Sequence, residues 1–152
     1  MKKLILFLFF TSLPVYGDQL VDFCIAVNGE LHRSYRCPKS GLKLPVRTCE
    51  YFNSQGDLQF VNGCSGPTGG HREYFFKACV VHDLCYHHEP STNGLERRDC
   101  DQLFLRTALE GCEQAPNQKV CQNWAKLMYN SLRLIGGPAY HCADEPANYS
   151  SL

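Results

Sequence analysis

Three residues in the middle of the chain, His82, Asp83 and Asp101, carry side chains that suit proton transfer and cation binding. A histidine that acts as a general base needs its second ring nitrogen held by a hydrogen-bond acceptor, usually a carboxylate, which fixes the tautomer. A carboxylate one residue further along the same helix points about 100° away. Asp83 is therefore badly placed to orient His82 but is available to bind a metal ion. The carboxylate that orients His82 has to come from a different element.

The element that carries His82 is predicted to be a helix from Tyr74 to about His88. Four of its residues recur at spacings of four, three and four, so they share one face. These residues are Phe75, Cys79, His82 and Tyr86. Glu89-Pro90 ends the helix, because proline has no backbone N–H and its ring clashes with the preceding turn. The histidine thus shares its helix face with a cysteine and a phenol.

A second helix is predicted to follow, running to about Cys112. Asn93 is the candidate N-cap of this helix, and Glu96 stands at the capping-box position three residues later. Asp101 lies near the start of this helix, where the helix dipole alone also favours an acid. Its position is thus compatible with a structural role as well as with orienting His82.

The pairing of the two helices decides between these roles of Asp101. Residues that contact across antiparallel helices have numbers with a roughly constant sum, and a disulfide between Cys85 and Cys100 would set that sum at 185. His82 and Asp101 sum to 183, and Tyr86 and Asp101 sum to 187. On this condition His82 faces Asp101 beside a disulfide, with the Tyr86 phenol close enough to hold the carboxylate.

The segment 79–86, which reads CVVHDLCY, and the later pair Cys100-Asp101 resemble the signature of the secreted phospholipases A2. In that family the motif commonly reads CCxxHDxCY, and the later helix begins with a Cys-Asp pair. The resemblance covers residues 62–112 and implies roles for four residues. These are the general base His82, the calcium ligand Asp83, the orienting carboxylate Asp101 and its supporting partner Tyr86.

The resemblance also implies two disulfides, Cys85–Cys100 and Cys64–Cys79. A further family disulfide is missing, because Ala78 and Thr107 stand where its two cysteines would fall. The numbers of these two residues also sum to 185, as expected if the helix pairing is right and one disulfide was lost as a unit.

A glycine-rich loop at residues 62–70, NGCSGPTGG, is the predicted calcium-binding loop. The common family loop reads CxCGxGG, whereas this one looks more like the shorter loops of the microbial and conodipine-like branches. Calcium prefers six to eight oxygen ligands, with carboxylates and carbonyls mixed. The expected ligands are the Asp83 carboxylate, the Gly63 carbonyl and the Asn62 side chain. The Ser65 carbonyl contributes instead if the loop follows the usual family register.

The N-terminus indicates export. Lys2 and Lys3 precede an apolar run from Leu4 to Phe10, and Val15-Tyr16-Gly17 is an acceptable cleavage site. Residues 1–17 are therefore predicted to be a signal peptide, and residues 18–152 a single secreted, extracellular phospholipase A2-like domain. All ten cysteines lie in this domain, and an even number in an exported chain favours disulfides. The sequence contains neither a CxxC…CxxC nor an HExxH arrangement, the patterns that would indicate a zinc site.

The predicted fold class is mainly α, with two antiparallel disulfide-linked helices, a calcium-binding loop and a small β-hairpin. Its parts are an irregular N-terminal region with a hairpin (18–61), the calcium loop (62–70), the catalytic helix pair (74–112) and a C-terminal helical region (113–142) with a helix at 119–135. The hairpin joins 49–52 to 58–61. Asn148 begins a glycosylation sequon. The sequence leaves six cysteines without an assigned partner: Cys24, Cys37, Cys49, Cys112, Cys121 and Cys142.

The charge excludes one class of partner. Removing Lys2 and Lys3 from 15 basic residues leaves 13 against 15 acidic ones, a net of −2, which is no basic surface for nucleic acid. The predicted activity is calcium-dependent hydrolysis of the sn-2 ester of glycerophospholipids in membranes or lipid aggregates, which releases a fatty acid and a lysophospholipid. The alternative is a non-catalytic secreted scaffold of the same fold, acting as a toxin subunit, matrix protein or receptor ligand. A second protein chain is compatible with either function.

Overall fold

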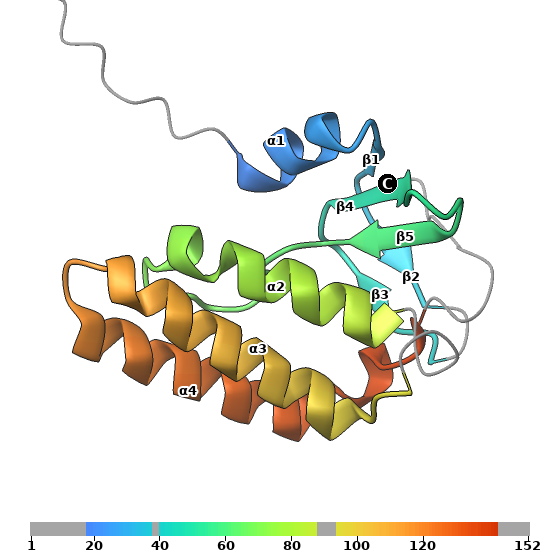
Figure 1. Cartoon of the computed structure of the whole chain (residues 1–152). Coiled ribbons are helices and arrows are strands. Elements are labelled where there is room, and N and C mark those ends of the chain that lie inside the picture. Colours follow the sequence, from blue (N-terminus) through green and yellow to red (C-terminus); the bar gives the residue numbers. More distant parts are fainter. Residues whose placement is uncertain (1–17, 38–39, 88–93, 143–152) are drawn as a thin grey trace, which may run out of the picture.

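The computed structural model describes residues 18–37, 40–87 and 94–142 (Figure 1). The predicted signal peptide, the candidate cap Asn93 and the sequon at Asn148 lie outside these residues. The described residues include four α-helices: α1 (Gln19–Ala26), α2 (Arg72–His87), α3 (Arg97–Gly111) and α4 (Gln118–Ile135). Two single turns of 3-10 helix follow α3 and α4, at Cys112–Gln114 and Gly137–Ala139. The mainly helical fold class is thus confirmed, and α4 lies within a residue of its predicted start.

Helix α1 contradicts the prediction that residues 18–61 are irregular apart from a hairpin. Asp18 caps this helix, because its Oδ1 accepts a hydrogen bond from the Leu20 backbone N–H at 3.2 Å. Leu20 and Cys24, four residues apart, are the buried residues of the helix, and the Cys24–Cys49 disulfide ties it to the neighbouring sheet. Eight residues with two buried positions give too few turns for the helical period to be recognised in the sequence.

The strands form two small antiparallel sheets. The first contains β1 (Glu30–His32), β4 (Thr48–Phe52) and β5 (Leu58–Val61) in the order β1-β4-β5, and the second pairs β2 (Tyr35–Arg36) with β3 (Lys43–Leu44). The predicted hairpin is confirmed as β4 and β5. Asn53 closes its turn, because its Oδ1 accepts the backbone N–H groups of Gln55 and Asp57 at 2.9 and 2.8 Å.

The start of α3 differs from the prediction. Its N-cap is Glu96, not Asn93, and the Glu96 backbone N–H donates to Asp99 Oδ2 at 3.0 Å in a capping box. Asp99 therefore supplies the acid that the helix terminus favours.

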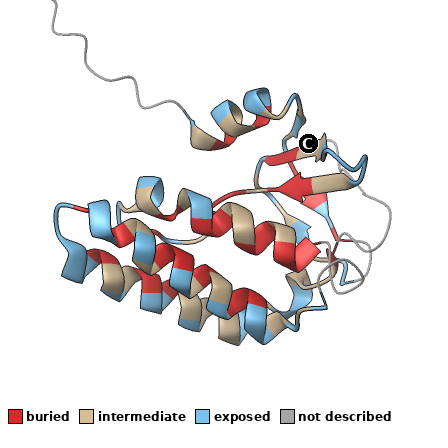
Figure 2. Ribbon diagram, in the orientation of Figure 1, coloured by how far each residue is buried: buried red, intermediate tan, exposed pale blue. Residues whose placement is uncertain are grey.

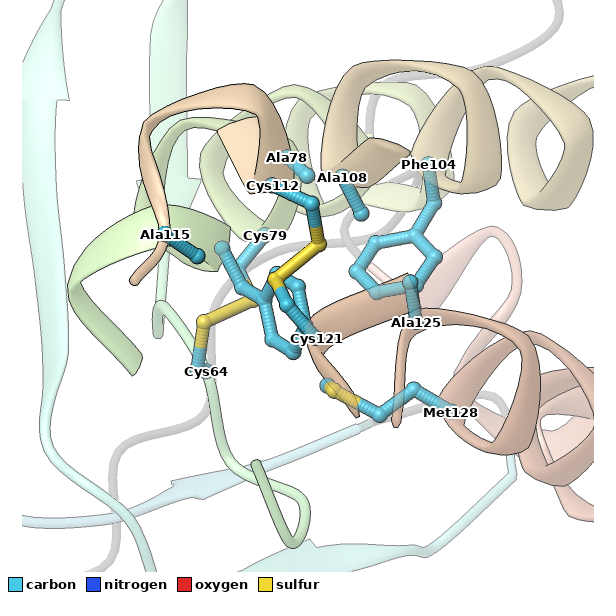
Figure 3. Close-up of a cluster of buried hydrophobic side chains, with 11 residues drawn as sticks. Cys64, Ala78, Cys79, Phe104, Ala108, Cys112, Ala115, Cys121, Ala125 and Met128 are labelled. Carbon is cyan, nitrogen blue, oxygen red and sulfur yellow. A yellow bond between two sulfur atoms is a disulfide. The ribbon is translucent and has the colours of Figure 1, made fainter. Parts of the chain in front are cut away.

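Helices α2, α3 and α4 lie side by side, with the main core between them and the glycine-rich loop (Figures 1 and 3). Phe75, Phe104 and Met128 supply the larger buried side chains of this core. Small residues fill the closest helix contacts: Ala78, Ala108 and Ala125. Figure 2 shows buried and exposed residues alternating along these helices, as expected for helices that bury one face. No helix in the described part of the chain has the length and apolar character needed to span a membrane.

Five disulfides pair all ten cysteines: Cys24–Cys49, Cys37–Cys142, Cys64–Cys79, Cys85–Cys100 and Cys112–Cys121. The two that the family resemblance implies are therefore present, and the six remaining cysteines form the other three. Ala78 and Thr107, at the place of the missing family disulfide, are both buried. The α2–α3 contact there is thus made by side-chain packing instead of a covalent bond.

Candidate active site

His82 of α2 and Asp101 of α3 form a buried hydrogen-bonded pair. His82 Nε2 lies 3.0 Å from Asp101 Oδ1, and the two residues are 6% and 0% exposed. The Cys85–Cys100 disulfide joins the two helices one turn further along. Since Asp99 serves the helix terminus, Asp101 is not needed as a first-turn acid and its side chain points inward to the histidine.

Asp101 accepts two more hydrogen bonds. The Tyr86 hydroxyl donates to Oδ1 at 2.6 Å, and Arg133 Nη1 donates to Oδ2 at 2.5 Å. Burial alone would raise the pKa of Asp101, but hydrogen bonds from His82, Tyr86 and Arg133 outweigh it, so the pKa is lowered. Asp101 therefore remains a carboxylate beside the imidazole.

Arg133 is the residue at this site that the sequence did not predict. It lies in the last turn of α4, where a cation is expected simply because it favours the helix C-terminus. Only the packing of α4 against α3 brings it to a carboxylate 32 residues earlier. A signal was nevertheless present, because a buried carboxylate with a neutral histidine as its partner requires a further cation or donor.

Replacement of Arg133 by glutamine is expected to slow any reaction in which His82 acts as the base about tenfold, because Asp101 loses one charged donor and holds the imidazole less firmly. The affinity for a ligand should change little, since Arg133 is not among the described residues that line the pocket beside His82. The control is Arg133→Lys, which keeps a cationic donor and should recover part of the loss. Equal activity of the wild-type protein and the glutamine variant would show that Arg133 does not position the pair.

The electrostatics of His82 suit a base. Burial lowers its pKa below the ordinary histidine value, and the hydrogen bond to Asp101 only partly opposes this effect. Because the carboxylate accepts from Nε2, this hydrogen-bond network assigns the proton to Nε2 and leaves the lone pair on Nδ1. Nδ1 has no hydrogen-bond partner among the described residues. A neutral imidazole thus keeps a proton-accepting nitrogen that no neighbour occupies.

His82 and Asp83 line a pocket of about 260 Å³. The glycine-rich loop forms one wall through residues 63–67, and α3 contributes Phe104. Four residues of α4 complete the lining: Met128, Ser131, Leu132 and Ile135. Most of these side chains are apolar, so the pocket combines a proton acceptor with a surface that suits a hydrocarbon chain.

Asp83 is the one carboxylate among the described residues that line this pocket. Its Oδ2 accepts the backbone N–H groups of Asn62 and Gly63 at 2.9 and 2.7 Å. Burial raises the pKa of Asp83 to about 8, although the two backbone donors lower it. Oδ1 accepts no hydrogen bond from the described residues. The carboxylate therefore presents one oxygen that is not committed to the loop.

The structure separates the loop residues that were predicted to bind calcium. Gly63 and Ser65 line the pocket with Asp83, and Gly63 has a φ of 67°, a conformation that glycine adopts without strain. Asn62 instead lines a larger cavity of about 1010 Å³ that shares residues 63–65 with the first. Its backbone, not its side chain, contacts Asp83. Among the described residues no cluster of three or more His, Cys, Asp or Glu side chains forms a metal site, so an ion here has to use backbone oxygens beside Asp83.

Helix α4 also holds the glycine-rich loop in place. A Cβ built on Gly69 would lie 2.1 Å from the Trp124 ring, and Gly69 has a φ of 57°. Trp124 therefore packs directly on the loop backbone. Glycine at 69 is required both by this contact and by the left-handed backbone.

The Gly69→Ala variant is expected to lose about 2–4 kcal/mol of unfolding free energy, from backbone strain and overpacking against Trp124. Chemical denaturation measures this loss. Gly70→Ala is the matched control, because Gly70 has a φ of 83° but a Cβ at this position would have nothing within 4 Å. It should lose only the part due to backbone strain. Equal losses in both variants would show that the contact with Trp124 does not fix the loop.

Comparison with known proteins finds relatives that match only part of the chain. No protein-family model matches the chain, and no solved structure matches it. Conodipine-P3 from Conus purpurascens is 40% identical over 62 residues, and conodipine-P2 and conodipine-P1 from the same organism are 39% identical over the same length. These segments cover 40% of this chain and 34% of each relative, so the match spans about a third of the length of these proteins. The chain is therefore related to the conodipines, one of the two branches whose loops its glycine-rich loop resembles.

Proposed function

We propose that this chain is a secreted phospholipase A2-type hydrolase that cleaves the sn-2 ester of glycerophospholipids. The observation that carries the proposal is the His82–Asp101 pair, whose unoccupied Nδ1 belongs to a residue lining a mainly apolar pocket. The relation to the conodipines agrees with this function over the matched segment. Ten cysteines paired in five disulfides suit the oxidising conditions outside the cell.

The residues of the chain act as follows. His82 Nδ1 takes a proton from a water molecule while the water oxygen attacks the ester carbonyl. Asp101 keeps the imidazole oriented and stabilises its positive charge, and Tyr86 and Arg133 hold Asp101. When the tetrahedral intermediate collapses, the glycerol oxygen leaves and takes the proton from Nδ1. The products are a fatty acid and a lysophospholipid, and His82 is neutral again.

The oxygen donors at the pocket fit a calcium ion. Asp83 supplies a carboxylate oxygen that accepts no hydrogen bond from the described residues, and Gly63 and Ser65, which line the same pocket, are the candidates to supply backbone carbonyls. Asn62 is the weaker candidate because its side chain is not placed there by any contact. A bound calcium ion supplies positive charge that polarises the ester carbonyl and attracts the phosphate.

One observation favours a second function, that of a secreted scaffold without catalysis. In the part of the chain that the structure describes, Asp83 is the one carboxylate at the pocket, and its Oδ2 already accepts hydrogen bonds from the loop. A site with so few charged ligands suits weak calcium binding, which is compatible with a secreted scaffold that binds another protein without catalysis. The intact His82–Asp101 pair argues against this function, since a scaffold has no use for a buried base.

The deciding experiment measures fatty-acid release from phosphatidylcholine vesicles by the correctly oxidised protein. It is run with millimolar calcium and again with chelator. Calcium-dependent release from the sn-2 position is the expected result. No release at any calcium level would reject the hydrolase and leave the scaffold.

The pH dependence of hydrolysis provides a separate test of the base. Since burial lowers the pKa of His82, the acid limb of kcat/KM is expected below the ordinary histidine value of about 6.5. Activity should be lost as pH falls through that limb, because protonated Nδ1 cannot accept a proton from water. The profile is measured with calcium at saturation. A limb above 6.5 would contradict the assignment of a buried neutral imidazole as base.

A further inference from the structure

Four of the exposed large hydrophobic side chains lie on α4. Val120, Leu127 and Leu134 are 42%, 49% and 83% exposed, and Ile135 is 78% exposed. The first three are spaced by seven residues, which is close to two helical turns, so they form a line along one side of the helix. We call these four residues the α4 stripe.

All charged side chains of α4 are cationic. A cation directly precedes each of the three residues in the line: Lys119, Lys126 and Arg133. The helix contains no aspartate or glutamate. Arg133 is engaged by Asp101, but Lys119 and Lys126 are exposed. An apolar stripe bordered by lysines suits an anionic surface with an apolar interior.

The stripe is continuous with the pocket that contains His82. Ile135 belongs to both, and Met128, Ser131 and Leu132 line the pocket from neighbouring positions of α4. A lipid that enters from this side meets apolar side chains along its path. This continuity favours a lipid surface over a second protein as the occupant, because a protein contact gains nothing from opening into the pocket.

We propose that the α4 stripe docks on an anionic phospholipid surface, with Lys119 and Lys126 at the headgroups. Docking in this orientation sets the mouth of the pocket against the lipid. The proposal rests on the proposed function for the identity of the occupant, but the docking itself is measured without catalysis.

The experiment measures binding of the His82→Gln protein to vesicles, so that hydrolysis does not alter the surface. Vesicles of phosphatidylglycerol and of phosphatidylcholine are compared by co-sedimentation. Adding Leu127→Ser and Leu134→Ser is expected to weaken binding at least about tenfold, since two apolar side chains no longer enter the lipid. Neither leucine lines the pocket. Adding Lys119→Glu and Lys126→Glu should weaken binding to phosphatidylglycerol by at least about twentyfold, with little effect on phosphatidylcholine.

The matched control replaces Ile25 and Phe52, which are 73% and 68% exposed on α1 and β4, by serine. It should bind as the parent protein does. Equal weakening in the control, or no weakening in the Leu127/Leu134 variant, would overturn the proposal. A dimer in solution that the leucine replacements dissociate would also overturn it, since a second copy then covers the stripe. All variants are first checked for an unchanged thermal midpoint.

Failure of the proposed function gives a different result. In the otherwise wild-type background, the Leu127/Leu134 variant should hydrolyse a short-chain monomeric phospholipid at the parent rate while losing activity on vesicles. If the wild-type protein does not hydrolyse the monomer but its vesicle binding still depends on the stripe, the docking stands and the hydrolase is rejected.

Discussion

His82→Gln is expected to lower kcat for phospholipid hydrolysis by about 10³–10⁴-fold, because Asp83, the other titratable residue among those that line the pocket, is assigned to calcium and not to proton transfer. Glutamine is close to histidine in size, and its side-chain amide can still donate to Asp101. The variant should therefore fold with all five disulfides and keep its thermal midpoint within a few degrees. Fatty-acid release and thermal unfolding measure the two effects separately.

Asp101→Asn is the companion variant. It keeps the shape of the side chain but removes the charge that orients and stabilises the imidazole, so a smaller loss than in His82→Gln is expected. A His82→Gln protein with activity close to wild type would show that the base is another group. A variant that loses its fold would leave the parent pH profile as the test of the same assignment.

Asp83→Asn is expected to remove the calcium response. Wild-type protein should gain thermal stability as calcium is added, because the ion binds the folded protein at a buried carboxylate. Asparagine can still accept the backbone N–H groups of Asn62 and Gly63 through its side-chain oxygen. The variant should therefore fold normally, show no calcium-induced shift in midpoint, and lose at least about 10²-fold in hydrolysis.

The calcium-induced shift in thermal midpoint also tests which loop residues bind the ion. Asn62→Ala should change the calcium-induced shift in thermal midpoint little, because Asn62 lines the larger cavity and not the pocket, and its backbone makes the contact to Asp83. An Asn62→Ala protein that loses its calcium response as completely as Asp83→Asn would place the side chain among the ligands after all. A calcium shift that survives Asp83→Asn would move the site elsewhere.

The helix pairing was the part of the site most accessible from the sequence. The sum of 185 that links Cys85 to Cys100 also describes Tyr74 and Gly111, where a Cβ on the glycine would lie 2.1 Å from the Tyr74 carbonyl oxygen. The rule holds because two straight antiparallel helices keep one register along their whole contact. The contact between His82 and Asp101 follows from it once the Cys85–Cys100 disulfide, which the family resemblance implies, sets the register.

The features that were missed depend on packing between distant segments. Helix α1 has only two buried residues and is held by one cap and one disulfide. Arg133 reaches Asp101 because α4 packs on α3, and although a buried carboxylate requires a further donor, the sequence does not identify which cation supplies it. The Cys37–Cys142 disulfide spans 105 residues, and cysteine spacing alone does not select it. Local patterns thus predicted the pair of α2 and α3, whereas the contribution of α4 to the site became visible only in the tertiary structure.

The order of the disulfides has a consequence for cleavage of the chain. Cys64–Cys79 joins the loop to α2, Cys85–Cys100 joins α2 to α3, and Cys112–Cys121 follows between α3 and α4. Each of these bonds closes a short ring around one connection of the site. A protease that cuts once between residues 86 and 99, or once between residues 113 and 120, therefore leaves two polypeptides that stay covalently attached. The pocket, its base and the orienting carboxylate can persist in a nicked protein that separates into chains only after reduction.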